Sequence, residues 1–173
     1  AHPPLLASGA IVELASAAGT RRLPADEFFV GPKRNAMRKD ELIAAFLVEP
    51  AKGPQQFSKV GTRNAMVIAV CSFALAIDSE RRRIGTGIGS AAPTPVRAIE
   101  AELFLAGVLD EKGLWEKPAA VDESALARFG QLVAAAANPI DDVRGTAAYR
   151  RHALAVMARR GFVWAWNDYR GNA

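Results

Sequence analysis

The run VIAVCSFALAID, residues 67–78, limits what this chain can fold into more than any other stretch. Apolar and β-branched side chains dominate it without a helical repeat, which is typical of a strand buried on both faces. The longest apolar run of the chain, residues 65–77, is too short to cross a bilayer as a helix. The segment SERRR follows as a turn, and RIGTGIGSAAP returns as a second strand. The sequence therefore predicts an antiparallel hairpin in the core.

The glycines at positions 85, 87 and 89 raise the question of a dinucleotide-binding loop. Such a loop has the order G-x-G-x-x-G, follows the first strand of a βαβ unit and places the diphosphate at a helix N-terminus. Here the order is G-x-G-x-G, and the segment SAAPTP separates the last glycine from the predicted helix. Glycines inside an antiparallel strand instead let another backbone or a flat ligand approach closely. We therefore expect no diphosphate loop at this position.

Charge and cysteine content exclude several classes of function. The net charge of +4 is mild, and the basic residues are scattered apart from RRR at 81–83. A nucleic-acid-binding domain concentrates such residues in a stripe with interleaved aromatic residues, so we expect neither a nucleic acid nor a membrane as partner. The single cysteine, Cys71, can form no disulfide within the chain, which suits a cytoplasmic location.

The chain opens with AHPPLLASGAIVEL, without an initiator methionine or a signal peptide. These first residues already resemble the interior of a domain. We interpret the sequence as a fragment, as a processed chain, or as one whose preceding part is not shown.

Turn residues divide the first third of the chain into short strands. Residues 10–16 predict a strand, and a glycine-centred turn leads into a second strand that ends at Pro24. Residues 25–31 predict a helical turn with Asp26 as its N-cap. The apolar run within 39–50 predicts a buried strand. The segment AKGPQQ, residues 51–56, contains glycine and proline without periodicity and is the predicted linker.

Helical patterns follow the hairpin. Thr94 is the expected cap of the first helix, with Pro95 at its first position and Gly107 at its end. A second helix is expected over 124–137, and a third begins near Thr146. Together with the hairpin they indicate an α+β fold. The third helix carries an apolar stripe at helical spacing, which comprises Tyr149, Ala153, Val156, Met157 and Trp164.

Several segments in this order carry a family resemblance. They are DELIAAFLVEP, QFSKVGTRNAMVIAV, GIGSAAPTPVRAIEAELFLAG and AAYRRHALAVMARRG, preceded by GTRRLPADEFFVG. Together they resemble the FAD-binding subunit of the molybdenum hydroxylases, the xanthine dehydrogenase and carbon monoxide dehydrogenase family. The likeness covers nearly the whole chain.

The resemblance implies an electron-transfer role. The family's flavin subunit carries FAD between an iron–sulfur partner and NAD or another acceptor, while molybdopterin and the [2Fe-2S] clusters reside on partner subunits. Residues 1–50 resemble the latter part of a two-part FAD-binding domain. Residues 57–173 resemble the C-terminal α+β domain, a small antiparallel sheet with three helices. The loops that hold the FAD diphosphate belong to an upstream part, so the chain alone is expected to hold flavin poorly and to be inactive.

The same resemblance implies site residues. Lys59 matches a lysine that reaches the flavin edge, where an ammonium group would stabilise the negative charge of the reduced ring. Ile43, or its neighbour Leu42, matches an aliphatic residue that packs on the flavin, and ordinary core packing is the alternative. Arg63 and Asn64 match a segment that controls access of the acceptor, and a plain surface loop is the alternative.

A second hypothesis needs no flavin chemistry in this chain. The small domain would then be a non-catalytic module that docks subunits, with Trp115, Trp164 and Trp166 as candidates for an exposed apolar patch. His152 lacks a second ligand three or four residues away, so we expect no metal there. We expect Tyr149 to pack inward, with Arg150 and Arg151 in solvent or paired.

Overall fold

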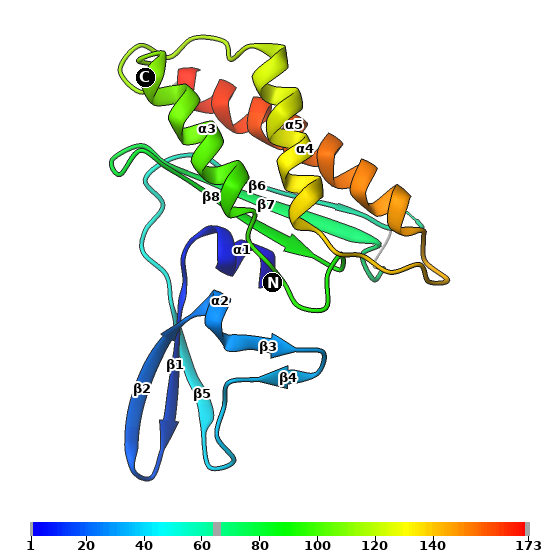
Figure 1. Ribbon diagram of the computed structural model, residues 1–173. Coiled ribbons are helices and arrows are strands. Elements are labelled where there is room, and N and C mark those ends of the chain that lie inside the picture. Colours follow the sequence, from blue (N-terminus) through cyan, green and yellow to red (C-terminus); the bar gives the residue numbers. More distant parts are fainter. Residues whose placement is uncertain (1, 64–66, 172–173) are drawn as a thin grey trace.

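The computed structural model describes residues 2–63 and 67–171. The chain forms two lobes (Figure 1). We call residues 8–50 the small lobe, and residues 2–7 together with 55–171 the large lobe. Small antiparallel sheets combine with helices in this arrangement, which confirms the predicted α+β class.

The small lobe is built on a three-stranded antiparallel sheet of order β2-β1-β5. The predicted hairpin is present, and Val12 and Leu14 point from its first strand into a core that also contains Leu23 and Phe28. Asp26 lies within the first turn of the short helix, whose N-cap is Pro24. The elements are β1 (Ile11–Ser16), β2 (Gly19–Pro24), α2 (Ala25–Phe28), β3 (Phe29–Gly31), β4 (Arg34–Asn35) and β5 (Leu42–Leu47).

Strand β5 differs from the sequence prediction. A strand does form there, but the expectation of a buried strand over 39–50 is wrong. Of its six residues only Ala45 is even half-buried. The apolar side chains are exposed because β5 is an edge strand and no other described element covers it.

The large lobe contains the predicted hairpin as β7 (Cys71–Asp78) and β8 (Arg83–Gly89), with β6 (Gln55–Val60) as the third strand. The sheet order is β6-β7-β8, all antiparallel, and every residue of β7 is buried. Residues 55 and 56 of the predicted linker are therefore the start of a strand. Helices α3 (Ile99–Glu111), α4 (Glu123–Ala136) and α5 (Ala147–Gly171) cover one face of the sheet (Figure 1).

Helix α1 (His2–Ala7) packs on the opposite face of the same sheet, although the chain then leaves it for the small lobe (Figure 1). The strand glycines make this contact possible. A Cβ atom on Gly85 would lie 2.0 Å from the Ala7 carbonyl oxygen, and one on Gly87 would lie 2.0 Å from that of Pro3. The expectation that these glycines admit another backbone is therefore confirmed.

The start of α3 also differs from the prediction. Thr94 and Pro95 lie before the helix, in a stretch that pairs with β8 through an Ile88–Val96 bridge, and Gly107 lies inside the helix. The helix begins at Ile99, where the hydroxyl oxygen of Thr86 accepts the Ala98 amide at 2.8 Å. A contact between distant residues sets this boundary.

A buried carboxylate joins β8, α3 and the small lobe. Glu102 accepts hydrogen bonds from the Thr86 amide at 2.8 Å and from the Thr86 hydroxyl at 2.7 Å. It also pairs with Arg97 at 2.5 Å, and the Arg97 guanidinium reaches Asp26 of the small lobe at 3.3 Å. The interaction with Glu102 raises the pKa of Arg97. This network is a polar link between the lobes.

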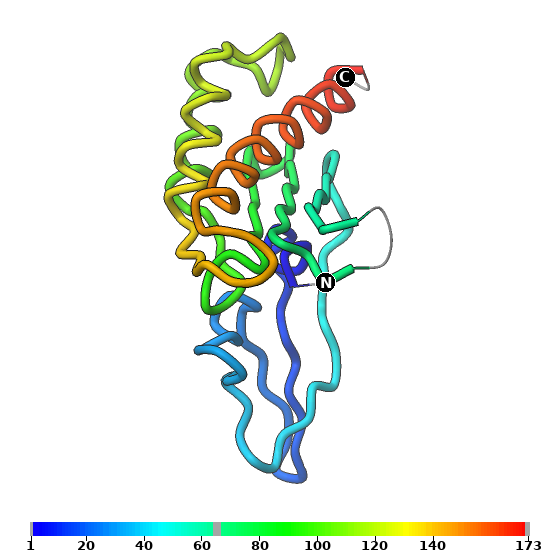
Figure 2. The backbone as a smooth tube through the Cα atoms, turned by 90° about the vertical axis from the view of Figure 1, so that its right-hand side faces the viewer, coloured from blue at the N-terminus to red at the C-terminus, as the bar shows by residue number. Residues whose placement is uncertain are grey.

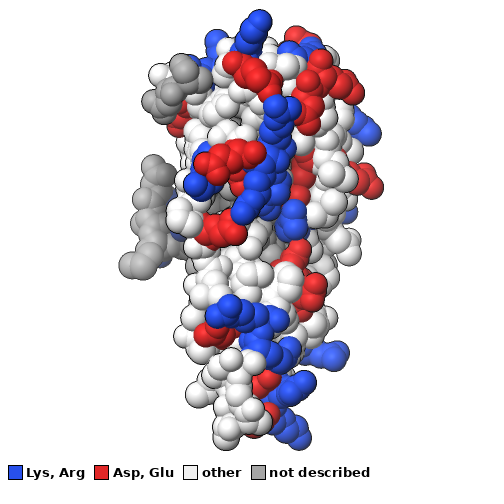
Figure 3. Space-filling model, turned by 90° about the vertical axis from the view of Figure 1, so that its left-hand side faces the viewer, with Lys and Arg blue, Asp and Glu red and all other residues white. Residues whose placement is uncertain are grey.

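Acidic and basic side chains are interleaved on the face shown in Figure 3, without a stripe of one sign. Among the described residues, no helix has the length and apolar content that a bilayer crossing requires.

Candidate functional site

Lys59 lies on the edge strand β6, opposite Ser72 of β7. Exposed and half-buried residues alternate along β6, so Lys59 shares the outward face with Phe57, which is 50 % exposed. The Lys59 amine donates a hydrogen bond to the carbonyl oxygen of Val67 at 3.3 Å. It thereby contacts the segment that follows β6 and still remains exposed to solvent.

The other candidates occupy different places. Leu42 and Ile43 lie on β5 of the small lobe, opposite Ala15 and Leu14, and are 74 % and 41 % exposed. Arg63 is exposed at the beginning of the segment after β6, and Asn64 lies outside the described residues. The structure brings Lys59 and the segment after β6 together, whereas Leu42 and Ile43 stand on a separate sheet.

An exposed apolar surface accompanies these candidates. Figure 2 shows β5, the connection to the large lobe, β6 and residues 61–63 and 67–70 along one side of the molecule. We call this surface the open side. The large apolar side chains of these segments that are at least one-third exposed are Leu42, Ile43, Phe46, Leu47, Val48, Phe57 and Ile68, and those of β5 alternate between the two faces of the strand. Exposed apolar side chains that gather on neighbouring segments are typical of a region that another body covers.

Glu41, directly before β5, is a structural residue that sequence reasoning missed. Its buried carboxylate accepts hydrogen bonds from Arg21 Nε at 2.6 Å, Arg21 Nη2 at 2.9 Å and the Arg38 amide at 2.6 Å. These interactions, the hydrogen bonds from Arg21 foremost, lower the pKa of Glu41 from 4.5 to about 2. An acidic residue next to an apolar run was the only signal for it in the sequence.

This carboxylate predicts a pH dependence of stability. Because the pKa of Glu41 is lower in the folded chain, its contribution is complete above pH 4.5 and is lost as the pH falls toward about 2. We expect the urea midpoint of the wild-type chain to decrease over this interval. A Glu41→Gln variant should start from a lower midpoint and decrease less. Parallel curves for the two chains would contradict the assignment.

The strand glycines do not form a phosphate cradle. The backbone of α1 occupies the space above Gly85 and Gly87, so closely that a Cβ atom on either glycine would clash with Ala7 or Pro3. A diphosphate would have to displace that helix.

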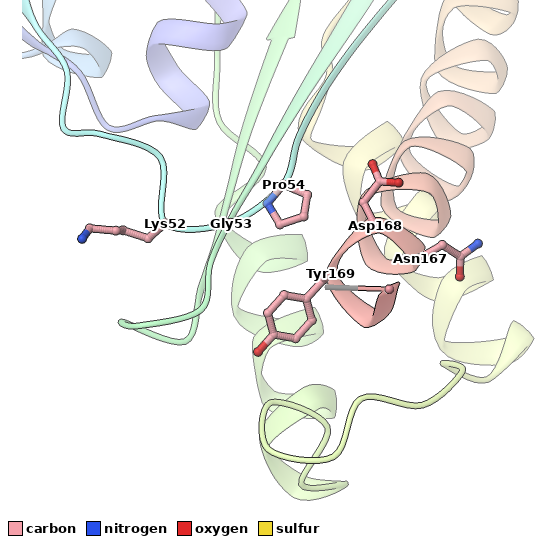
Figure 4. Close-up of a pocket in the computed structure, with 7 residues that line it drawn as sticks. Lys52, Gly53, Pro54, Asn167, Asp168 and Tyr169 are labelled. Atoms are coloured by element: carbon pink, nitrogen blue, oxygen red, sulfur yellow. The ribbon is translucent and has the colours of Figure 1, made fainter. Parts of the chain in front are cut away.

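A cavity of about 760 Å³ lies between the connection to β6 and the end of α5 (Figure 4). Its side chains do not converge on one point: Lys52 extends away from the others and pairs with Glu80 at 3.2 Å. The Tyr169 hydroxyl donates to the Trp115 carbonyl oxygen at 3.0 Å. The lining includes none of the candidate site residues, and we assign it no chemistry.

Two expectations concern helix α5. Arg150, expected in solvent or paired, is paired: it is 4 % exposed and donates to the Ser90 carbonyl oxygen at 2.6 Å and to Asp142 at 2.5 Å. Tyr149, expected to pack inward, is 47 % exposed. Around His152, as elsewhere in the described chain, no group of three or more potential ligands could hold a metal ion.

The expected tryptophan patch is reduced to a single residue. Trp115 and Trp166 are buried in the core of the large lobe, and only Trp164 is exposed, at 49 %. Cys71 is fully buried, and this burial raises the pKa of its thiol to about 11. The thiol is therefore a packing group and a poor nucleophile.

Comparison with known protein families identifies the family of this chain. Residues 56–165 match the CO dehydrogenase flavoprotein C-terminal domain, and residues 1–50 match the FAD binding domain in molybdopterin dehydrogenase. The chain belongs to the FAD-binding subunits of the molybdenum hydroxylase family. The resemblance found in the sequence is thereby confirmed, and so is FAD as the cofactor of this family.

Three known proteins resemble the chain to different degrees. The chain is 30 % identical over 161 residues to the glyceraldehyde dehydrogenase medium chain of Sulfolobus acidocaldarius, across 91 % of this chain and 53 % of that protein. It superposes on a chain of the CO dehydrogenase from Oligotropha carboxidovorans with a TM-score of 0.80 and 27 % identity, over 95 % of this chain and 56 % of that one. Quinoline 2-oxidoreductase from Pseudomonas putida shares the fold, with a TM-score of 0.77 at 20 % identity, over 96 % of this chain and 56 % of that one. The chain thus spans about half the length of these relatives.

Proposed function

We propose that this chain forms one wall of an FAD site in the flavin subunit of a molybdenum hydroxylase. The observation that carries the proposal is the open side, where the exposed edge strand β5 and the strand β6, which carries the exposed amine of Lys59, lie along the same side of the molecule. A flat aromatic cofactor with a charge-bearing edge needs an apolar cover and a nearby cation. The residues present fit the ring of FAD.

The residues present do not fit the diphosphate of FAD. The only glycine-rich strand of the described chain is covered by α1, and neither lobe offers a glycine loop at the start of a long helix. We infer that residues outside this segment supply the diphosphate site. The division proposed is residues 1–50 as the latter part of the FAD-binding domain, 51–56 as the linker and 57–173 as the C-terminal domain.

In this assembly each candidate has a distinct task. Lys59 would place a positive charge at the edge of the ring, Ile43 or Leu42 would exclude water from its face, and the Arg63–Asn64 segment would control access of the acceptor. FAD, when bound, can accept electrons singly and deliver them in pairs. We propose an iron–sulfur subunit as the donor, with molybdopterin on a further subunit, and NAD or another acceptor as the recipient.

Reconstitution tests the proposal. The 173-residue chain, purified alone, should carry no flavin. Co-expressed with the preceding half of a related flavoprotein subunit, such as that of the Oligotropha carboxidovorans CO dehydrogenase, it should co-purify with a flavin absorbance band. A stable complex of the two parts that binds no FAD would refute the proposed function.

Replacement of Lys59 tests the role of the charge. We expect Lys59→Met in the full-length subunit to retain FAD and to lower its two-electron reduction potential, because reduced flavin carries the negative charge that the amine stabilises. A loss of about 1.4 kcal/mol of differential interaction corresponds to about 30 mV. Lys117→Met, at an exposed lysine on the loop after α3, is the control and should leave the potential unchanged. Equal potentials in both variants would remove Lys59 from the site.

The docking hypothesis keeps one supporting observation, the exposure of Trp164. A subunit contact there is compatible with flavin binding on the open side. The two hypotheses differ in the reconstitution experiment. A pure docking module would bind no flavin even after the upstream half is added.

A further inference from the structure

A groove of about 430 Å³ runs between one flank of α5 and the edge strand β6. We call it the α5 groove. Val156, Met157 and Ala153 line it from the helix, and Ser58 and Val60 line it from the strand. Tyr149 and Trp164 also line it, and both are about half exposed, at 47 % and 49 %. At 1.5 Å per helical residue these two rings are about 22 Å apart, so an occupant that touches both must be elongated.

The strand side of the groove offers backbone hydrogen bonds. Within the described residues, β6 is an outer strand of its sheet, with β7 as its neighbour. Pro54 accepts the Ile77 amide at 3.0 Å, and antiparallel ladders alternate inward and outward residues. The amides of Gln56 and Ser58 therefore face β7, while those of Phe57 and Lys59 face outward. Extended peptides add to sheets along such edges.

The charge of the groove selects the chemistry of the occupant. The charged side chain that lines it is Arg160, beside His152; Lys59 lies at its edge with its side chain on the other face of β6, next to Phe57, and no acidic residue lines the groove. A second copy of this chain, paired through the same strand, would bring like charges together, which disfavours self-association. A carboxylate of an extended segment satisfies Arg160, and apolar side chains at alternate positions fill the space over Val156 and Met157.

We propose that the α5 groove binds an extended acidic segment of a partner polypeptide, which adds to β6 as a further strand. Tyr149 and Trp164 contact its two ends, and Arg160 pairs with a carboxylate between them. This surface shares strand β6 with the open side, but it uses the outer edge of the strand and the flank of α5 and not the face that carries the Lys59 side chain, so it does not depend on flavin binding.

Hydrogen exchange on the full-length subunit tests the proposal, free and within its native complex. The amides of Phe57 and Lys59 should exchange freely in the free subunit and become protected in the complex, while those of Gln56 and Ser58 stay protected in both. Trp164 emission should shift to shorter wavelength on assembly, and a Trp164→Phe variant should lack the shift. FAD content, measured on the same samples, reports separately on the proposed function.

A charge reversal provides the affinity test. Arg160→Glu should weaken association of the subunit with its complex by about tenfold or more, because it places a carboxylate against carboxylates. Arg151→Glu carries the same charge change on the same helix outside the groove and should have less than about twofold effect. Unprotected β6 amides in the complex, equal effects of the two variants, or protection that arises by dimerisation of the free subunit would each overturn the proposal. So would cross-links that place the subunit's own preceding half in the groove.

Discussion

Replacing Gly87 with valine is expected to lower the free energy of unfolding by about 3 kcal/mol or more and to detach α1 from the sheet. The first side-chain carbon would lie 2.0 Å from the Pro3 carbonyl oxygen and 2.7 Å from its carbon. These are backbone atoms, which cannot rotate away as the end of a side chain can. Urea denaturation measures the loss, and hydrogen exchange at residues 5–10 measures the release of the helix.

Gly107→Ala is the matched control. Gly107 lies inside α3 with no atom within 4 Å of a new Cβ, so alanine should stabilise the chain by about 0.5–1 kcal/mol. If Gly87→Val were as stable as the wild type, α1 would not depend on this close contact.

Glu102→Ala is expected to cost about 3 kcal/mol, the magnitude seen when one partner of a buried ion pair is removed. The change leaves the Thr86 amide without its acceptor and Arg97 without its closest counter-ion. Because Thr86 and Arg97 also fix the start of α3 and the contact with Asp26, the link between the lobes should loosen as well. Chemical denaturation gives the first effect, and proteolysis of the connection at 48–54 gives the second.

Glu100→Ala, at an exposed position in the same first turn of α3, should change stability by less than about 0.5 kcal/mol. Similar losses in the two variants would mean that helix-terminal charge, and not the buried network, accounts for the effect.

The sequence correctly predicted the elements whose ends are set by residues close to them in the chain. The small-lobe hairpin follows from its glycine turn, and α4 ends at Ala136, one residue before the predicted end at 137. The start of α3 was wrong because Thr94 and Pro95 have the chemistry of a helix start, while pairing with Ile88 holds the following residues extended. The predicted burial of β5 was wrong. An apolar run indicates side chains that are stabilised by being covered, but it does not show whether the same chain covers them.

The candidate site was predictable only through the family resemblance. Lys59 is a plain lysine at a strand edge, and nothing in QQFSKV separates it from a solvated residue. The roles of Glu41 and Glu102 were not predicted. Arg38 and Arg97 are close to them in the chain, but their other hydrogen-bond partners are 16 or more positions away. Sequence spacing does not reveal such pairs.

The path of the chain between the lobes has a mechanical consequence. The backbone crosses between them twice, at residues 8–10 after α1 and at residues 48–54 before β6, and the Arg97–Asp26 pair adds a third point of attachment. A body tied at two separate backbone points resists torsion and can swing only about the line that joins them. Any relative movement of the lobes is therefore expected to follow one hinge axis, and the Arg97–Asp26 pair is placed to limit its extent.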